Sequence, residues 1–141
     1  MAHPLRIDRS DDPALAHAIR RAVFVEEQGI AEALEFDGTD PGFTHWVGWS
    51  DGHPVATLRG RLEGATLRIG RVATLPDARG QGHGRALMTA VMDWGRQGGA
   101  RHAELSAQDH VVTWYRTLGF AVAGPPYLEA GILHRDMVAP L

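Results

Sequence analysis

The sequence predicts an α/β fold with one mixed central sheet, in which antiparallel N-terminal strands precede a βαβα unit and a C-terminal hairpin. Three observations favour this fold class. Three strand-like segments are joined by Asp51-Gly52 and Glu63-Gly64, which are favourable hairpin turns. Two amphipathic helical patterns then alternate with strand-like segments, as in a parallel βαβ connection. The last strand-like segments follow one another closely, so we expect them to pair.

The first predicted element is a helix. Asp11-Asp12-Pro13 forms a helix-start signal, and apolar residues then recur at helical spacing as far as about Gln28. Glycine and acidic residues dominate residues 29–42, which predicts a long loop with a short helical turn near Ala31–Leu34. The three strands of the N-terminal unit follow, at His45–Trp49, Val55–Leu62 and Leu67–Leu75.

A glycine-rich stretch, Arg79–Gly84, opens the second half of the chain. It leads into a helix with apolar residues on one face, and Gly98-Gly99 ends that helix. The remaining predicted elements are a strand at His102–Ala107, a helix marked by Val111, Tyr115 and Leu118 and ended by Gly119, and strands at Phe120–Ala123 and Ile132–Val138.

Length and composition bound the class of protein. The chain has 141 residues, a formal net charge of −3 and 44% hydrophobic residues, which predicts a single domain over 1–141 with its elements between about Leu5 and Val138. No apolar run approaches the ~20 residues of a membrane span, and the first residues lack a charged-then-apolar leader. We therefore expect a cytoplasmic protein without a membrane partner. The mild acidity gives no support to nucleic-acid binding.

Residue types that are missing exclude further chemistry. The chain has no cysteine, which excludes disulfides, thiolate zinc sites and cysteine nucleophiles. All 14 basic residues are arginine, so a phosphate loop ending in Gly-Lys-Ser/Thr and a lysine Schiff base are excluded as well. The eight histidines include no His-x-x-x-His pair, and we therefore expect no metal site.

The strongest chemical signal is the segment Arg79-Gly80-Gln81-Gly82-His83-Gly84. Glycines at alternate positions let successive backbone N–H groups turn toward one point, where a helix N-terminus adds partial positive charge. Such a segment can bind a pyrophosphate, with Arg79 and Arg85 contacting its oxygens. The alternative is a flexible loop that eases the start of the helix. A dinucleotide-binding fold is disfavoured, because Pro76–Ala78 separates the glycines from the strand and Glu104 falls near the start of the next one.

These motifs resemble those of the GNAT superfamily of N-acetyltransferases, which transfer an acetyl group from acetyl-coenzyme A (acetyl-CoA) to an amine. Arg79, Gly82 and Gly84 match the family's Arg/Gln-x-x-Gly-x-Gly/Ala motif. Trp114-Tyr115 and Gly119-Phe120 match its aromatic-Tyr-x-x-x-Gly-Phe ending. The resemblance spans nearly the whole chain and implies a GNAT-like sheet with splayed strands.

The resemblance also implies which residues bind acetyl-CoA. The glycine loop would hold the pyrophosphate, and the backbone of the preceding strand would lie along the pantetheine arm. Gln108 stands where family members commonly carry an asparagine near the coenzyme. The implied set is Arg71, Val72, Ala73, Thr74, Arg79, Gly80, Gln81, Gly82, His83, Gly84, Arg85 and Gln108.

Three further segments resemble the ElaA-like branch of this family. They are Val23-Phe24-Val25-Glu26-Glu27-Gln28, Ala107-Gln108 and Glu129-Ala130-Gly131-Ile132-Leu133-His134. The branch does not identify the acceptor, so we expect a small-molecule or peptide amine and leave a homodimer open.

Attack of an amine on a thioester requires a neutral nucleophile and benefits from a proton delivered to the leaving thiolate. Tyr115 is the candidate acid, because a phenol is close in pKa to a thiol, although its helical position equally fits a core tyrosine. Glu27, where the first helix meets the long loop, is the candidate base. In the family, a free backbone N–H near Val72–Thr74 usually stabilises the thioester oxygen. The other candidate bases are Glu26, His45, His110, His134 and an ordered water.

The predicted function is direct acetyl transfer from acetyl-CoA to a primary amine in a ternary complex, since the absence of cysteine excludes a cysteinyl acyl-enzyme. The alternative is a non-catalytic acyl-CoA-binding sensor with the same loop and no working acid or base. The stretch from Glu26 to Asp40 is acidic and contains no basic residue, which predicts a preference for cationic acceptors. The alternative for this stretch is a solvated loop without a role in selection.

Overall fold

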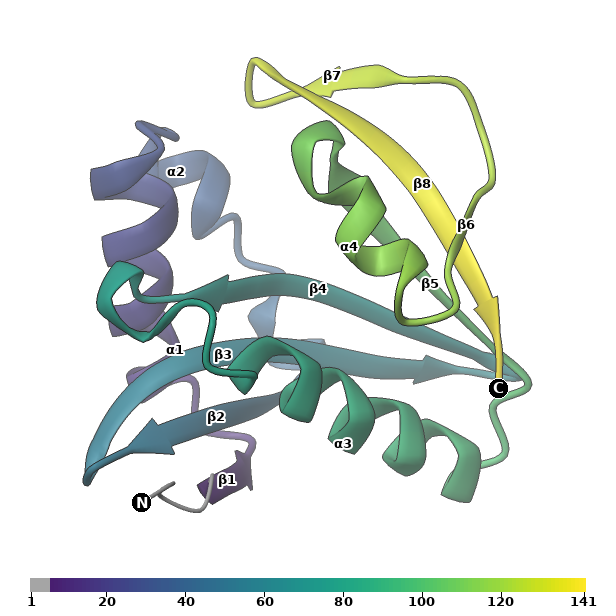
Figure 1. Cartoon of the computed structure of the whole chain (residues 1–141), viewed down its shortest axis with the longest axis horizontal. Helices are drawn as coiled ribbons and strands as arrows, with labels where there is room; N and C mark the ends of the chain where they lie inside the picture. Colours follow the sequence, from purple (N-terminus) through teal and green to yellow (C-terminus); the bar gives the residue numbers. More distant parts are fainter. Residues whose placement is uncertain (1–5) are drawn as a thin grey trace.

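The computed structural model describes residues 6–141, and the strands in this part of the chain belong to one sheet (Figure 1). Their order is β1-β2-β3-β4-β5-β8-β6, with β7 paired to β8 beside this path. This mixed sheet confirms the predicted fold class. The first five residues, with His3 and the expected start of the domain, lie outside the described residues.

The N-terminal half of the sheet is an antiparallel meander. Positive φ angles of 49° at Asp51, 79° at Gly52 and 60° at Gly64 form the two predicted turns. The edge strand β1 (Arg6–Ser10) pairs with β2. It was not predicted, because its sequence has a single apolar residue and no alternating apolar face. The other strands of the meander are β2 (Thr44–Ser50), β3 (His53–Glu63) and β4 (Thr66–Thr74).

The sheet opens in its middle. β5 (His102–Gln108) is parallel to β4, but the two strands pair only between Thr66–Arg68 and His102–Glu104. Beyond this point they diverge, as Figure 1 shows, and the divergence matches the expected splayed strands. The rest of this half consists of β8 (Ile132–Pro140), which pairs with β5 along its length, and the short strands β6 (Ala121–Val122) and β7 (Tyr127–Glu129).

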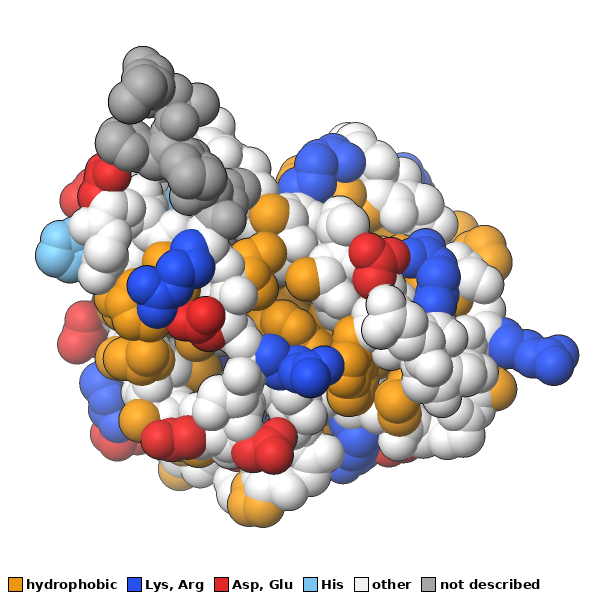
Figure 2. Space-filling view, turned by 90° about the horizontal axis from the view of Figure 1, so that it is seen from below, with side chains coloured by type: hydrophobic (Ala, Val, Ile, Leu, Met, Phe, Trp, Pro, Cys, Tyr) orange, Lys and Arg blue, Asp and Glu red, His pale blue; other side chains and the backbone are white. Residues whose placement is uncertain are grey.

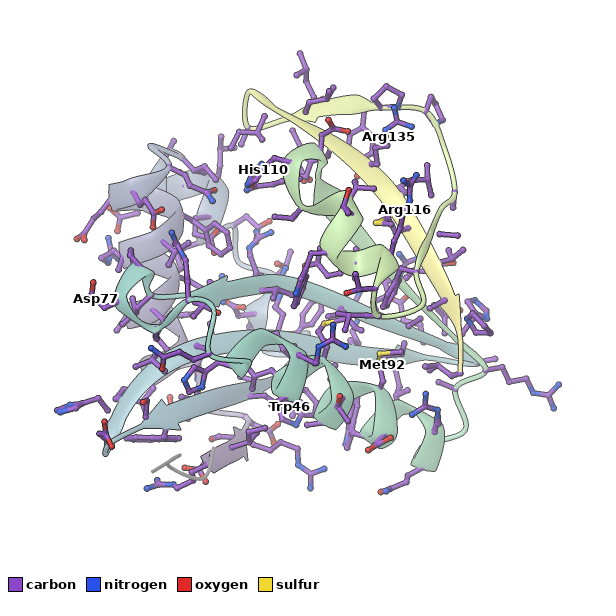
Figure 3. The ribbon with its side chains drawn as sticks, viewed as in Figure 1. Trp46, Asp77, Met92, His110, Arg116 and Arg135 are labelled. Carbon is purple, nitrogen blue, oxygen red and sulfur yellow. The ribbon has the colours of Figure 1, made fainter. Side chains whose placement is uncertain are left out.

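Helices cover both faces of the sheet. Neighbouring residues on β2 show this arrangement, since Trp46 belongs to the same buried cluster as Met92 of one helix, whereas Val47 belongs to a second cluster with Ile19 of another helix. Trp46 and Met92 are labelled in Figure 3. The helices are α3 (His83–Gln97) and α4 (Val112–Arg116) on one face, and α1 (Ala14–Arg20) with its continuation η1 (Arg21–Glu27) on the other.

The first helix has the predicted extent but not one uniform geometry. Its second half, η1, is π-helical. The Gln28 N–H donates to the carbonyl of Val23, five residues earlier, at 3.1 Å, instead of to the residue four positions earlier. Hydrophobic spacing over seven residues does not separate the two helix types, and π-helical turns are frequent at functional sites. The long loop contains α2 (Glu32–Glu35), which confirms the expected helical turn. Short 3₁₀ turns are η2 (Asp40–Gly42), η3 (Pro76–Ala78) and η4 (Asp109–Val111).

Among residues 6–141, no helix is long and apolar enough to cross a membrane.

Candidate active site

A cleft of about 1230 Å³ lies where β4 separates from β5. Its walls are the end of η1, the loop around α2, the second half of β4, the glycine loop, the start of α4, and one face of β5 and β8. Of the predicted site residues, only Gln81 does not line this cleft; its side chain donates to the Asp77 carbonyl at 3.3 Å. The structure therefore brings together residues that were predicted from separate segments.

The glycine loop presents open backbone at one end of the cleft. Gly80 and Gly82 have φ angles of 76° and 88°, and a Cβ atom at either position would meet nothing within 4 Å. Gly82 is the N-cap of α3 and has no side-chain cap, so the first N–H groups of this helix are free of a capping side chain. Open, positively polarised backbone of this kind fits a pyrophosphate.

Side chains of the same loop are engaged within the protein. Arg79 binds both carboxylate oxygens of Glu27, at 2.8 and 2.6 Å, and its Nε donates to the Thr74 carbonyl at 3.0 Å. Arg85 donates to the Thr117 hydroxyl at 3.1 Å. The His83 side chain is buried against the sheet. The geometry therefore assigns the predicted cradle mainly to backbone groups rather than to these side chains.

Gly84 has a packing reason as well as its place in the motif. A Cβ atom here would lie 3.1 Å from the Trp114 ring of α4, which is tighter than normal contact. The absence of a side chain thus lets the first turn of α3 approach α4, and the two predicted motifs meet in space.

A β-bulge interrupts β4 beside the cleft. Thr57 faces Ala73 and Arg59 faces Gly70, so both Arg71 and Val72 stand opposite a single residue of β3. A bulge leaves one residue without its regular ladder partner. This is the segment expected to supply a backbone donor to the thioester oxygen, and residues 71–74 line the cleft.

Tyr115 lies on α4 between the cleft and the core. Its side chain is 6% exposed, and its ring makes edge contacts with Trp114 and Phe120. Burial raises the pKa of its phenol above the usual value. Tyr115 is therefore a neutral phenol with a proton to donate at ordinary pH, and both predicted roles, in the core and at the cleft, agree with its position.

Glu27 lines the cleft beside Arg79 of the glycine loop. The hydrogen bonds from Arg79 lower the pKa of its carboxyl. A carboxylate with a lowered pKa is a weaker base, so this pairing suits Glu27 as the partner of Arg79 better than as the acceptor of a proton.

Two histidines among the alternative bases also line the cleft. His110, labelled in Figure 3, lies in η4, directly before α4. His134 lies on β8 with Nδ1 2.6 Å from the Ile132 carbonyl oxygen. Because a carbonyl only accepts, Nδ1 carries the proton of this hydrogen bond. Nε2 lies 3.5 Å from a Glu129 carboxylate oxygen.

The remaining alternatives lie away from the cleft. His45 is buried, and burial lowers the pKa of its imidazole. Neither His45 nor Glu26 lines the cleft. Among the described residues, no group of three metal-ligating side chains occurs.

Arginines from other elements pair with five of the six acids in the stretch that was expected to attract cations. The sequence argument counted only residues within the stretch, and the preference for cationic acceptors stays a prediction. Figure 2 likewise shows arginine and acidic side chains interspersed on the face it views. The pairs are Glu27 with Arg79 at 2.6 Å, Glu32 with Arg21 at 2.9 Å, Glu35 with Arg20 at 2.7 Å, Asp37 with Arg71 at 3.5 Å, and Asp40 with Arg20 and Arg59 at 2.7 and 2.8 Å.

Part of this network is fully buried, which sequence reasoning missed. The side chains of Arg20 and Glu35 are 1% and 4% exposed. Burial acts to raise the pKa of Asp40, but hydrogen bonds from Arg20 and His17 hold it well below its usual range. One signal was present: Arg20 lies one helical turn after Ala16, beside Ile19, on the apolar face of the first helix. A charged residue on that face indicates a buried partner.

The fold and this site define an acyltransferase of the kind that uses an acyl-CoA thioester. The family described as "Acetyltransferase (GNAT) family" matches residues 13–120, and the chain belongs to that family. Among curated relatives, YyaT of Bacillus subtilis is 31% identical over 132 residues, covering 92% of this chain and 89% of YyaT.

Solved structures agree with this assignment. An acyl-CoA N-acyltransferase from Pseudomonas aeruginosa is 31% identical with a TM-score of 0.82, covering 96% of this chain and 99% of that one. ElaA of Escherichia coli is 25% identical with a TM-score of 0.83 over the same shares of the two chains. The similarity to ElaA confirms the resemblance noted from the sequence.

Proposed function

We propose that this chain is an N-acetyltransferase that transfers an acetyl group from acetyl-CoA directly to a primary amine in a ternary complex. The observation that carries the proposal is the cleft between β4 and β5, which joins an open glycine loop, a strand bulge and a buried phenol. Membership of the GNAT family supports acyl-CoA as the donor.

The residues lining the cleft fit this cosubstrate. Backbone N–H groups of residues 80–84 would bind the pyrophosphate, and the exposed backbone of residues 71–74 would lie along the pantetheine arm. The Gln108 side-chain amide donates to the side-chain oxygen (Oε1) of Gln28 at 2.8 Å, and both residues line the cleft, so Gln108 is placed to exchange this partner for an amide of the arm.

In the proposed reaction the amine nitrogen bonds to the acyl carbon, the carbon–sulfur bond breaks, and the sulfur leaves with the bonding electron pair. A backbone N–H at the β4 bulge, where the regular ladder is interrupted, would stabilise negative charge on the carbonyl oxygen. The Tyr115 phenol delivers a proton to the sulfur, and bulk solvent restores that proton. The base takes one proton from the attacking nitrogen.

Between the candidate bases, we favour His134 over Glu27. The Nε2 atom of His134 is available in the tautomer set by the Ile132 carbonyl, whereas Arg79 occupies both oxygens of Glu27. The variant His134→Gln should therefore lower kcat with little change in coenzyme affinity. Glu27→Gln should instead weaken coenzyme binding, because it frees Arg79 and the segment that it anchors.

The acceptor remains an amine of small-molecule or peptide type, and the charge pairs remove the argument for a strongly cationic one. Because acetyl-CoA is the cosubstrate, we place the enzyme in the cytoplasm. A homodimer stays a prediction for which the described surface gives no argument.

The test is an acceptor screen read by free thiol release from acetyl-CoA, together with calorimetric titration of CoA. Saturable binding and acetylation of at least one amine are expected. Binding without turnover on any amine would favour the alternative of an acyl-CoA sensor, and absence of binding would overturn both.

A further inference from the structure

The Arg71 side chain joins the bulge of β4 to the loop that carries α2. Its Nη2 lies 3.2 Å from the Glu35 carbonyl oxygen and 3.5 Å from that of Leu34. Its Nε lies 3.1 Å from a carboxylate oxygen of Glu35, and Nη2 is 3.5 Å from Asp37. One guanidinium therefore spans several groups of a segment that lies more than thirty residues away in sequence.

The partner of Arg71 is itself held firmly. The Arg20 Nε donates to the Glu35 carboxylate at 2.7 Å, and Nη2 of Arg20 donates to the Glu35 carbonyl at 3.2 Å. Arg20 also binds Asp40 at 2.7 Å. Because Arg20 and Glu35 are almost fully buried, this end of the link is rigid.

The backbone conformation of the bulge requires stabilising contacts of this kind. Arg71 has a φ angle of 53°, inside a strand and on a residue with a Cβ atom. Left-handed backbone is unfavourable for such residues and persists only where the surroundings maintain it. The contacts with Glu35, Leu34 and Asp37 are surroundings of this kind.

We propose that Arg71 is a positioning residue, whose guanidinium holds the β4 bulge so that its unpaired backbone N–H faces the acyl carbonyl. This inference rests on the proposed function. It predicts a larger effect on acyl transfer than on coenzyme affinity, because the pyrophosphate would be bound at the glycine loop and only the pantetheine arm would lie along residues 71–74.

The first test is Arg71→Asn, since asparagine tolerates left-handed backbone and lacks the guanidinium. We expect kcat to fall about 10- to 100-fold, the scale of a small misplacement of a reacting group, while the Kd for CoA rises by a clearly smaller factor. Arg71→Lys should not restore kcat, because one ammonium does not reproduce the planar fork that reaches several acceptors. In Arg71→Gly, added guanidinium ion should restore part of kcat, and urea at the same concentration should not.

The matched control is Arg21→Asn. Arg21 also joins a helix to the same loop, through its 2.9 Å pair with Glu32, but it does not contact the bulge. Amide hydrogen exchange separates the two variants without an activity measurement. Exchange should accelerate at residues 70–74 in Arg71→Asn alone, and kcat should be nearly unchanged in Arg21→Asn.

Each result decides the matter. Wild-type kcat in Arg71→Asn, equal losses in kcat and CoA affinity, or full restoration by lysine would overturn the positioning role. If Arg71→Asn does not fold, the glycine variant with guanidinium ion decides. If the wild-type protein acetylates no amine, the proposed function fails, and unchanged exchange at residues 70–74 would then also refute the hold on the bulge.

Discussion

The two ends of the cleft differ in the groups that form them: backbone at one end and charged side chains at the other. At the glycine-loop end, the local backbone supplies the groups proposed to bind the coenzyme, with positive φ angles at Gly80 and Gly82 directly before α3. At the opposite end, side chains from distant segments meet in one charged network. Its members are Arg20, Glu35, Asp40, Arg59 and Arg71.

This difference determines how well each end of the cleft can be predicted from the sequence. A backbone site needs a run of adjacent residues with special conformations, so it leaves a contiguous motif. A side-chain network needs only residues that folding brings together, and each member looks like an ordinary surface charge in the sequence. The predictions below test whether backbone geometry controls coenzyme binding and whether the network controls stability and the acceptor end.

The largest effect is expected from Gly82→Val. Valine is β-branched and strained at the φ angle of 88°, and its side chain would project into the open space where the pyrophosphate is expected to bind. Calorimetry should detect no CoA binding, while the circular dichroism spectrum stays that of a folded protein.

The control for strain is Gly64→Val in the turn between β3 and β4. Gly64 also has a positive φ angle, of 60°, and open space at its Cβ position. This variant should lose a similar amount of stability, roughly 1–2 kcal/mol, and bind CoA normally. Normal CoA binding by Gly82→Val would refute the cradle.

Much of the fold could be predicted from the sequence because local signals agree with the tertiary arrangement. The hairpin turns at Asp51-Gly52 and Glu63-Gly64 and the stop at Gly98-Gly99 specify their own conformations. β1 could not be predicted, because its pairing with β2 does not depend on an apolar face. The π-helical geometry of η1 also left no sequence signal.

The site divides in the same way. Residues 79–84 form a motif, whereas the contacts of Arg71 depend on a loop far along the chain. Counting charges within residues 26–40 left out the ion-pair partners Arg20, Arg59 and Arg79, which lie outside that window. Composition within a segment does not report the charges that folding places against it.

The second prediction concerns stability at the charged network. Asp40→Asn removes the carboxylate that pairs with Arg59 and one of the two carboxylates that pair with Arg20, and both arginine side chains are less than a tenth exposed. Breaking one partner of a buried pair costs about 3–5 kcal/mol, measurable by urea unfolding. CoA affinity should change little if the two ends are independent.

The pH dependence checks the same carboxylate. The folded-state pKa of Asp40 lies below its unfolded value of about 4. Its contribution is therefore fully present above the unfolded pKa and is lost as pH falls through the folded pKa. Below about pH 4, the free energy of unfolding should fall more steeply with pH for the wild type than for Asp40→Asn. The same pH dependence for both proteins would show that Asp40 is not paired in solution.

The third prediction separates the two roles of Tyr115. Tyr115→Phe keeps the ring contacts with Trp114 and Phe120 and removes only the hydroxyl. Turnover should fall by roughly 10²-fold, the scale of general acid catalysis, with unchanged CoA affinity. Wild-type turnover, under conditions where chemistry limits the rate, would assign Tyr115 to the core alone.

The smallest effect is expected for acceptor charge. Each loop acid that faces the cleft has an arginine partner, as with Glu35 and Arg20 or Asp37 and Arg71, so the net field at the acceptor end should be weak. Two amines of similar size, one with a carboxylate and one with a second ammonium, should differ in KM by a ratio that changes less than about twofold between low and high salt. The exposed pair of Arg21 and Glu32 offers a charge-neutral deletion: Arg21→Gln with Glu32→Gln should leave both KM values unchanged and cost no more than about 1 kcal/mol. A strong preference for the diamine that shrinks as salt rises would show that these pairs open in solution, and it would restore the acidic field as the basis of acceptor selection.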